Sequence, residues 1–215
     1  MKNKKIWMVP LSVAPLLMVL AVYGRLPAQV PMHWGIDGTV DRYGNKNELF
    51  VIAGINILMG IMFYFLPKID PKRKNYDRFQ GAYDWMVIWT LGFMAAITGV
   101  TLAETMHPGR FDMTKVICGM VALLFIFLGN MMPKIKRNFF TGVKTPWTLS
   151  NDTVWNKTHR LGGKCFVAGG ILMLLGAFFV SGKVLFGMVL AVSVIIMILP
   201  MGMSYFLYKK ETKEV

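Results

Sequence analysis

Three polar residues near the N-terminus have side chains of the kind that bind metal ions. His33, Asp37 and Asp41 follow one another at intervals of four residues, which would align them on one face of a helix. Imidazole and carboxylate groups are common ligands of zinc. Gly35 and Gly38 disfavour a helix here, so the three side chains would have to converge from turns. We therefore assign no metal and no other cofactor, and we interpret the three as hydrogen-bonding residues that stabilise a loop; a metal site is the alternative.

The segment around these residues runs from Leu26 to Lys46 and is rich in proline and glycine. The pairs Asp37-Gly38 and Gly44-Asn45 are typical of turns. Five apolar residues would anchor the segment, so we predict a folded loop and not a flexible linker: Val30, Trp34, Ile36, Val40 and Tyr43. The candidate ligand-binding residues of this loop are His33, Trp34, Asp37 and Asp41.

A second group of polar residues lies between positions 133 and 164. Its side chains could take part in acid–base or nucleophilic catalysis: Thr145, Asp152, Lys157, His159 and Arg160. Their order matches no HExxH, P-loop or GxSxG pattern. We therefore predict that the chain is not an enzyme, and a membrane-bound enzyme of unknown substrate stays as an alternative.

The same segment contains the signals of a helix start. Ser150 is a typical N-cap, Asp152 suits the positive end of a helix, and Gly162 suits the stop. These residues predict a short helix over about Asn151–Leu161. Its apolar and basic residues would occupy opposite sides, which is typical of an amphipathic helix in the membrane interface. His159 would then be a polar tip at that interface.

Long hydrophobic stretches must position both polar regions. The chain of 215 residues is 55% hydrophobic and 16% charged, with a mean hydropathy of +0.50. Six such stretches each approach the length of roughly 20 residues that crosses a bilayer, and a backbone in lipid must be helical. We therefore predict an all-α, polytopic membrane helix bundle with six transmembrane helices: Ile6–Tyr23, Leu49–Leu66, Trp85–Ala103, Val116–Met132, Cys165–Gly182 and Val184–Tyr208.

The basic residues predict how the spans are oriented. The N-terminus, the 67–84 and 133–164 loops and the C-terminal tail together carry 18 of the 24 Lys and Arg residues, and such an excess marks cytoplasmic segments. Both termini and the 133–164 loop are therefore predicted to be cytoplasmic, and the loop at 26–46 external. The net charge of +13 reflects this topology and does not indicate direct binding of nucleic acid.

The interiors of the spans disfavour active transport. They carry no Asp, Glu, Lys, Arg or His at depth, whereas pumps depend on such groups; a small-molecule transporter stays as an alternative. Asn56, near the centre of the second span, is predicted to form an interhelical hydrogen bond. Pro10, Pro15 and Pro200 are predicted to kink their helices. Small residues four apart would allow close helix packing at Gly92/Ala96, Ala95/Gly99 and Gly187/Ala191.

Both polar regions resemble a known family. Asn138-Phe-Phe-Thr-Gly-Val-Lys-Thr-Pro-Trp-Thr-Leu149 and Val154-Trp-Asn-Lys-Thr-His-Arg-Leu-Gly-Gly163, preceded by Gly129-Asn130, are similar to the hallmark of the SdpI immunity family. The loop with Leu26-Pro27, Pro31, His33-Trp34, Gly38, Asp41 and Lys46 resembles the DUF1648-like companion module often found N-terminal to it. On this resemblance we expect an N-terminal module at residues 1–66 and an SdpI-like module at residues 67–215.

The resemblance implies a function. The type member of the family is a bacterial, multi-pass cell membrane protein that protects its cell from a secreted antimicrobial peptide toxin. It also transduces a signal by holding a small cytoplasmic autorepressor at the bilayer. The expected partners here are therefore the lipid bilayer, a toxin outside and a repressor inside; a scaffold without a ligand is a further alternative. The external loop would face the toxin, and the cytoplasmic docking candidates are Asn138, Gly142, Thr145, Pro146, Trp147, Trp155, Lys157, His159 and Arg160.

Overall fold

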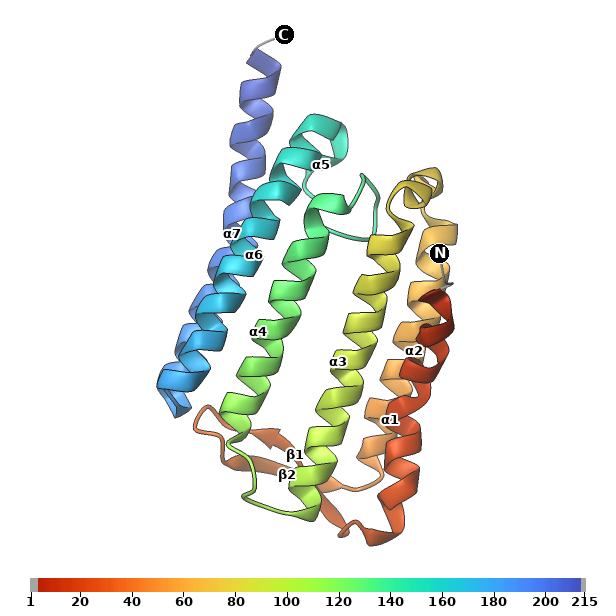
Figure 1. Ribbon diagram of the computed structural model, residues 1–215, viewed down its shortest axis with the longest axis vertical. Coiled ribbons are helices and arrows are strands. Elements are labelled where there is room, and N and C mark those ends of the chain that lie inside the picture. The colour runs from red at the N-terminus through yellow and green to blue at the C-terminus, as the bar shows by residue number, and fades with distance from the viewer. Residues whose placement is uncertain (1–3, 214–215) are drawn as a thin grey trace.

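Long helices that run side by side make up most of the molecule. The computed structural model describes residues 4–213 of the chain, and the side chains of residues 6–212; Lys2, one of the N-terminal basic residues counted above, lies outside them. Within this part, six helices are long and apolar enough to cross a membrane. They are α1 (Met8–Val22), α2 (Glu48–Ile69), α3 (Gln80–Met106), α4 (Met113–Met131), α6 (Asp152–Phe179) and α7 (Gly182–Lys213), as Figure 1 shows. The predicted six-helix bundle is confirmed.

The surface of these helices is suited to lipid and not to water. Only 22–33% of each hydrophobic stretch is buried inside the protein. Large apolar side chains are exposed along the helices, for example Leu58 at 64%, Phe178 at 73% and Ile198 at 62% exposure. A soluble protein rarely exposes apolar patches of this extent. The bilayer therefore covers most of the helical surface.

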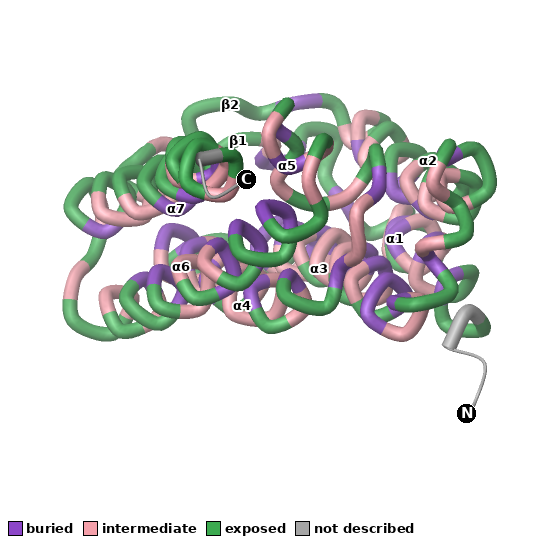
Figure 2. Tube along the Cα trace, turned by 90° about the horizontal axis from the view of Figure 1, so that it is seen from above, coloured by how far each residue is buried: buried purple, intermediate pink, exposed green. Residues whose placement is uncertain are grey.

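The helices form a curved layer. Figure 2 shows it from above, with α7 and α6 on one side, α4 and α3 in the middle, and α1 and α2 on the other side. Neighbours along the layer are in contact, and α2 packs against both α1 and α3. At one end of the layer lie the short helix α5 (Pro146–Ser150) and the C-terminal part of α7; two strands cover the other end (Figure 1). We call these the motif end and the hairpin end.

A β-hairpin closes the hairpin end. Strand β1 (Gln29–Trp34) pairs antiparallel with β2 (Val40–Asn45), so the predicted folded loop is in fact a small sheet. The turn at Asp37-Gly38 is confirmed, and Gly38 has a φ of +84°. The turn predicted at Gly44-Asn45 is wrong, because Gly44 pairs with Val30 inside the sheet. A side chain at Gly44 would collide with Glu48, so glycine serves packing at this position.

The hairpin is anchored on the spans by apolar contacts. Val30 is fully buried and belongs to a cluster with Val19 of α1, Leu49 of α2 and Leu102 of α3. This cluster fixes the hairpin across the ends of three helices. The tip reaches α4, because a Cβ at Gly38 would lie 2.7 Å from Oγ1 of Thr114.

The separate interfacial helix at Asn151–Leu161 is wrong. Helix α6 begins at Asp152 and continues without a break through Gly162 into the fifth span. Its N-cap is Asn151, whose Oδ1 accepts from the backbone N–H groups of Thr153 (2.8 Å) and Val154 (3.1 Å). Ser150 instead ends α5, the preceding short helix.

Gly162 and Gly163 do not end the helix because their backbone packs against α4 and its continuation. A Cβ at Gly163 would lie 2.7 Å from the carbonyl oxygen of Gly129, and one at Gly170 would lie 2.8 Å from that of Ala122. Glycine at these positions therefore lets α4 and α6 approach closely. The predicted small pairs are not where this happens: Gly92 and Gly187 have open space around them, and Gly99 has only ordinary contact, 3.9 Å from Sδ of Met18.

The hydrogen bond predicted for Asn56 is confirmed, and it joins α1 to α2. Its Nδ2 donates to the backbone oxygens of Leu11 (2.8 Å) and Ser12 (3.2 Å), and the residue is 1% exposed. Pro15 explains why an asparagine is needed at position 56. Because proline has no N–H, the carbonyl four residues earlier, that of Leu11, loses its helical partner, and Asn56 supplies the missing donor.

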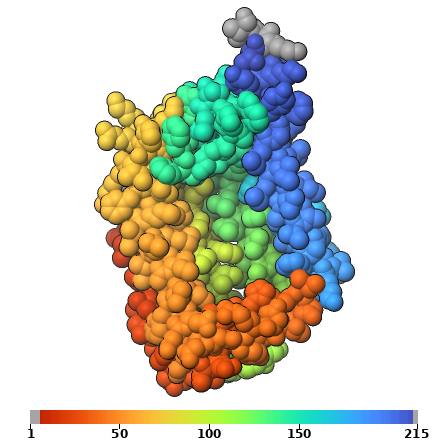
Figure 3. Space-filling view, turned by 180° about the vertical axis from the view of Figure 1, so that it is seen from behind, coloured from red at the N-terminus to blue at the C-terminus, as the bar shows by residue number. Residues whose placement is uncertain are grey.

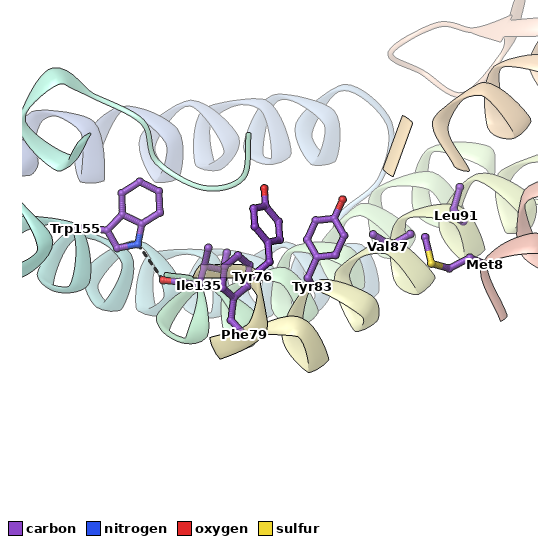
Figure 4. Close-up of a cluster of buried hydrophobic side chains, with 8 residues drawn as sticks. All are labelled: Met8, Tyr76, Phe79, Tyr83, Val87, Leu91, Ile135 and Trp155. Carbon is purple, nitrogen blue, oxygen red and sulfur yellow. Dashed lines mark hydrogen bonds between the residues drawn. The ribbon is translucent and has the colours of Figure 1, made fainter. Parts of the chain in front are cut away.

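A cluster of buried hydrophobic side chains lies toward the motif end of the layer. Tyr76 lies in the short 3-10 helix at Arg73–Arg78, and Phe79 directly follows that helix. Figure 4 shows both beside Tyr83 and Val87 of α3. The Trp155 indole donates from Nε1 to the carbonyl oxygen of Ile135 at 2.9 Å, drawn as a dashed line in Figure 4. The cluster thus connects α3, the start of α6 and the segment between α4 and α5.

Candidate functional site: a buried polar network at the motif end

The centre of the motif end is His159, which is 0% exposed. Its Nδ1 lies 2.8 Å from the backbone oxygen of Trp155, and its Nε2 accepts from the backbone N–H of Val143 at 3.0 Å. Because a peptide nitrogen can only donate, Nε2 must be unprotonated and Nδ1 must carry the proton. The imidazole is therefore neutral. The polar interfacial tip predicted for His159 is wrong, since its face of α6 turns toward the protein interior.

Two contacts fix the position of the His159 ring, one on its face and one at its edge. The Trp155 indole stacks on the face with ring centres 4.1 Å apart and an angle of 20°. Gly142 lies at the Nε2 edge, where a Cβ would be 2.1 Å from Nε2 of His159. Gly142 also has a φ of +105°, which L side chains rarely adopt. The motif therefore needs glycine at this position both for the backbone and for the room it leaves to the histidine.

Asn138 organises the turn that precedes Gly142. It is 0% exposed, and its Oδ1 accepts from the backbone N–H groups of Phe140 (2.9 Å) and Thr141 (2.6 Å). Its Nδ2 donates to the backbone oxygens of Lys136 (2.9 Å) and Thr141 (3.0 Å). One amide thus satisfies four backbone groups, and this fixes the segment between α4 and α5.

Asp70 links this turn to the connection between α2 and α3. The carboxylate is 2% exposed and accepts from the backbone N–H groups of Lys72 (2.7 Å) and Phe139 (2.9 Å) and from the Tyr76 hydroxyl (3.2 Å). Burial raises the pKa of Tyr76, and the charge of Asp70 adds to this. The phenol therefore stays protonated and donates to the carboxylate.

Thr145 links the stretch between α4 and α6, residues 135–151, to α7. We call this stretch the motif segment. It caps α5 in a reciprocal capping box with Thr148: its backbone N–H donates to Oγ1 of Thr148 (2.9 Å), and its own Oγ1 accepts from the Thr148 N–H (3.2 Å). Oγ1 of Thr145 also lies 2.9 Å from Oγ of Ser204, and both residues are buried. The segment is thus hydrogen-bonded to the α2–α3 connection, to α6 and to α7.

The predicted docking residues divide into two groups. Asn138, Thr145, Trp155 and His159 are buried, so they shape the motif end and are not free to contact a partner. The others have partly or largely exposed side chains or, for Gly142, backbone. Trp147 packs edge-on against Tyr205 of α7 at 5.1 Å, Lys157 pairs with Glu211, and Pro146 and Arg160 are exposed.

Sequence reasoning missed three residues of the network: Asp70, Thr148 and Ser204. Asp70 and Ser204 lie far from the motif in the chain and carry no local signal. Thr148 lies inside the motif, three residues after Thr145, and this threonine spacing is the signal of a cap. It could have shown that a helix begins at Pro146.

An apolar cavity lies beneath the motif segment on the concave side of the layer. Its volume is about 390 Å³, and its walls come from α3, α4, α6, α7 and the residues around Val143. Four methionines contribute to it: Met86, Met132, Met197 and Met201. Figure 3 shows this face hollowed between the motif segment above, the hairpin below, and α2 and α7 at the sides.

At the hairpin end, the predicted ligand-binding residues bond mainly to one another and to the turn. Nδ1 of His33 lies 2.6 Å from Oδ1 of Asp41, and both side chains are at least half exposed. Asp37 accepts from the backbone N–H (3.1 Å) and the hydroxyl (2.7 Å) of Thr39, and these bonds lower the pKa of its carboxyl. Trp34 pairs with Val40 across the sheet.

His33, Asp37 and Asp41 do not assemble into a metal site. Among the described residues, no group of three or more His, Cys, Asp or Glu side chains is placed to hold a metal ion. The hydrogen-bonding role interpreted for the loop is the one that the structure shows.

Comparison with known proteins gives matches over both halves of the chain. The SdpI/YfhL protein family matches residues 134–204, which include the network around His159. A domain of unknown function, DUF1648, matches residues 11–65, which include α1, the hairpin and most of α2. The "Immunity protein SdpI" of Bacillus subtilis (strain 168) is 25% identical over 192 residues, covering 89% of each chain. No solved structure matches the chain.

The resemblance seen in the motif residues is thus confirmed. Together with the six apolar helices, the matches identify the chain as an SdpI-like, multi-pass cell membrane protein, with an SdpI/YfhL family region at residues 134–204 and a DUF1648 region at residues 11–65.

Proposed function

We propose that the chain is an immunity protein that protects its cell from a secreted antimicrobial peptide toxin. The observation that carries this proposal is the similarity to the Immunity protein SdpI of Bacillus subtilis, which extends over 89% of both chains. The similarity covers both the hairpin end and the motif end. In this proposal the hairpin end faces outward and the motif end faces the cytoplasm, in keeping with the excess of Lys and Arg there.

The hairpin is the proposed contact for the toxin. It covers the ends of α1, α2 and α3 and carries exposed polar side chains, His33, Asp37 and Asp41. The apolar cluster beneath it connects the hairpin to three spans. A bound peptide could therefore change how these spans pack, provided that it binds one packing arrangement better than the other.

The motif segment is the proposed reporter on the cytoplasmic side. Asp70, His159 and Ser204 join it to the α2–α3 connection, α6 and α7, so a shift of any of these elements would strain its hydrogen bonds. Its exposed residues, including Pro146 and the partly exposed Trp147, are the proposed contact for a small autorepressor. The buried motif residues keep this surface in shape.

Deletion of the gene tests the proposal. We expect cells without the chain to be killed in spent medium of their parent strain, and expression of the chain to restore survival. The double variant His33→Ala/Asp37→Ala should restore less protection at equal membrane levels. The matched control is Arg110→Ala, which changes an exposed charge on the α3–α4 connection at the same end. Equal survival with and without the chain would refute immunity.

Trp147→Ala tests the signalling part separately. Because Trp147 is only partly buried, its loss should leave protection and protein level unchanged. It should lower the toxin-dependent activity of a reporter fused to the promoter of the chain's own gene. A variant that signals as the unaltered chain does would remove this surface as the docking site and leave immunity intact.

A further inference from the structure

A second groove opens between α4 and α6 at the motif end. Its volume is about 460 Å³, and it is separate from the apolar cavity beneath the motif segment. Gly129 and Gly163 form its floor, where the backbones meet. Because neither glycine has a side chain, the two helices pack closely while a furrow stays open at the surface. Figure 1 shows α4 and α6 side by side along this line.

Two basic side chains lie at the motif end of the groove without a partner. Arg160 and Lys164 line it, are one turn apart on α6 and are exposed. Neither forms an ion pair or a hydrogen bond with any residue whose side chain the structure describes. Two other basic residues of the motif end are paired: Arg137 with Asp152 at 2.7 Å, and Lys157 with Glu211. The two free cations therefore leave the groove positive.

The rest of the groove is apolar and runs along the span. Val167, Ala168 and Ile171 continue its wall over the next two turns of α6, and Ile171 is 46% exposed. At the upper rim, the side-chain amide of Asn130 donates to the backbone oxygen of Ile126 at 2.9 Å. Its carbonyl oxygen is left to accept from a hydroxyl group.

We propose that this groove binds an anionic phospholipid. The phosphate lies between Arg160 and Lys164, a hydroxyl of the headgroup reaches Asn130, and an acyl chain follows Val167, Ala168 and Ile171. Basic pockets between transmembrane helices at the membrane surface are suited to anionic headgroups. A free phosphate would satisfy only the two cations, whereas a lipid also covers the apolar wall. The lipid would hold α4 and α6 together beside the Gly129–Gly163 contact.

Lipid retention by the purified full-length chain tests the proposal. The protein is reconstituted in vesicles of phosphatidylglycerol and phosphatidylcholine in equal amounts and then extracted, and the lipids that stay bound are counted by native mass spectrometry. We expect phosphatidylglycerol to be retained in preference to phosphatidylcholine. Arg160→Gln/Lys164→Gln should lower its retention on the order of tenfold, as the loss of two charges near an anionic headgroup predicts.

The control variant removes the same number of positive charges as the groove variant. Lys209→Gln/Lys210→Gln removes two exposed cations from α7 that do not line the groove, and it should retain phosphatidylglycerol as the unaltered chain does. Ala168→Trp fills the apolar part, leaves both cations in place, and should also lower retention. Far-ultraviolet circular dichroism and gel filtration identify variants that are folded.

Three results would overturn the proposal. The first is equal retention of the two lipids by the unaltered chain. The second is an equal loss in the α6 and α7 double variants, which would show a general effect of charge. The third is full retention by Ala168→Trp together with displacement of the bound lipid by millimolar inorganic phosphate, which would show a phosphate site without a lipid. None of these results bears on toxin protection, which is measured in cells.

Discussion

Gly142 and His159 come from opposite sides of α5 in the sequence and meet at the motif end. The histidine accepts from Val143 and donates to Trp155, and the glycine leaves the space that the ring needs. The similarity of the motif to a known family marked both residues from the sequence. It did not show that they contact each other, because a contact between a loop and a helix depends on the tertiary fold.

Replacement of Gly142 by alanine should destabilise the protein. The new methyl group would collide with His159, and the positive φ would be strained, which alone costs about 1–3 kcal/mol. The midpoint of thermal unfolding in detergent should therefore fall. Gly109→Ala is the matched control, because Gly109 has a φ of +77° with open space around it. An equal fall in both variants would show that the contact with His159 contributes nothing.

The burial of the motif residues was the part of the site that the sequence did not reveal. The pattern of Trp155 and His159 next to basic residues predicts an amphipathic helix, and such helices lie in the membrane interface. The same pattern also arises when one face packs on other parts of the protein, as it does here. The backbone groups of Ile135 and Val143, which pair with Trp155 and His159, decide between the two, and they belong to another element of the fold.

At the scale of elements, hydropathy was sufficient to locate the spans. Lipid admits only helices that satisfy their own backbone, so six long apolar stretches had one structural solution. Element ends and contacts were harder to predict. Gly162 continues α6 because Met132, just after α4, and Pro200 of α7 pack on it. The strands of the hairpin have no clear alternation of apolar residues, because the ends of α1, α2 and α3 bury them.

The pair of Pro15 and Asn56 gives a prediction at this scale. Asn56→Val should destabilise the contact between α1 and α2 by about 0.6–2 kcal/mol, because the carbonyl of Leu11 loses its donor. In a Pro15→Ala background the helix supplies an N–H to that carbonyl, and the cost of Asn56→Val should be smaller. A double-mutant cycle on unfolding in detergent measures the difference. Additive effects would contradict the account of why asparagine occupies this position.

At the scale of the whole molecule, the two ends have different constructions. The hairpin end is a small sheet on an apolar cluster, whereas the motif end is a network of buried polar groups that joins three elements. The spans between them expose apolar surface on most sides. A polar network ties the ends of helices together where lipid provides no hydrophobic force between them.

The proposals for toxin contact and for repressor docking both depend on which end faces the cytoplasm. Cysteine labelling on intact cells measures this directly. In a Cys118→Ser/Cys165→Ser background, single cysteines replace Thr39 at the hairpin tip or Asn156 near the start of α6, both of which are exposed. A membrane-impermeant maleimide should label the cysteine at Thr39 on intact cells and the one at Asn156 only after the membrane is opened. Labelling of the Asn156 position on intact cells, with the Thr39 position protected, would contradict the orientation and with it the roles proposed for both ends.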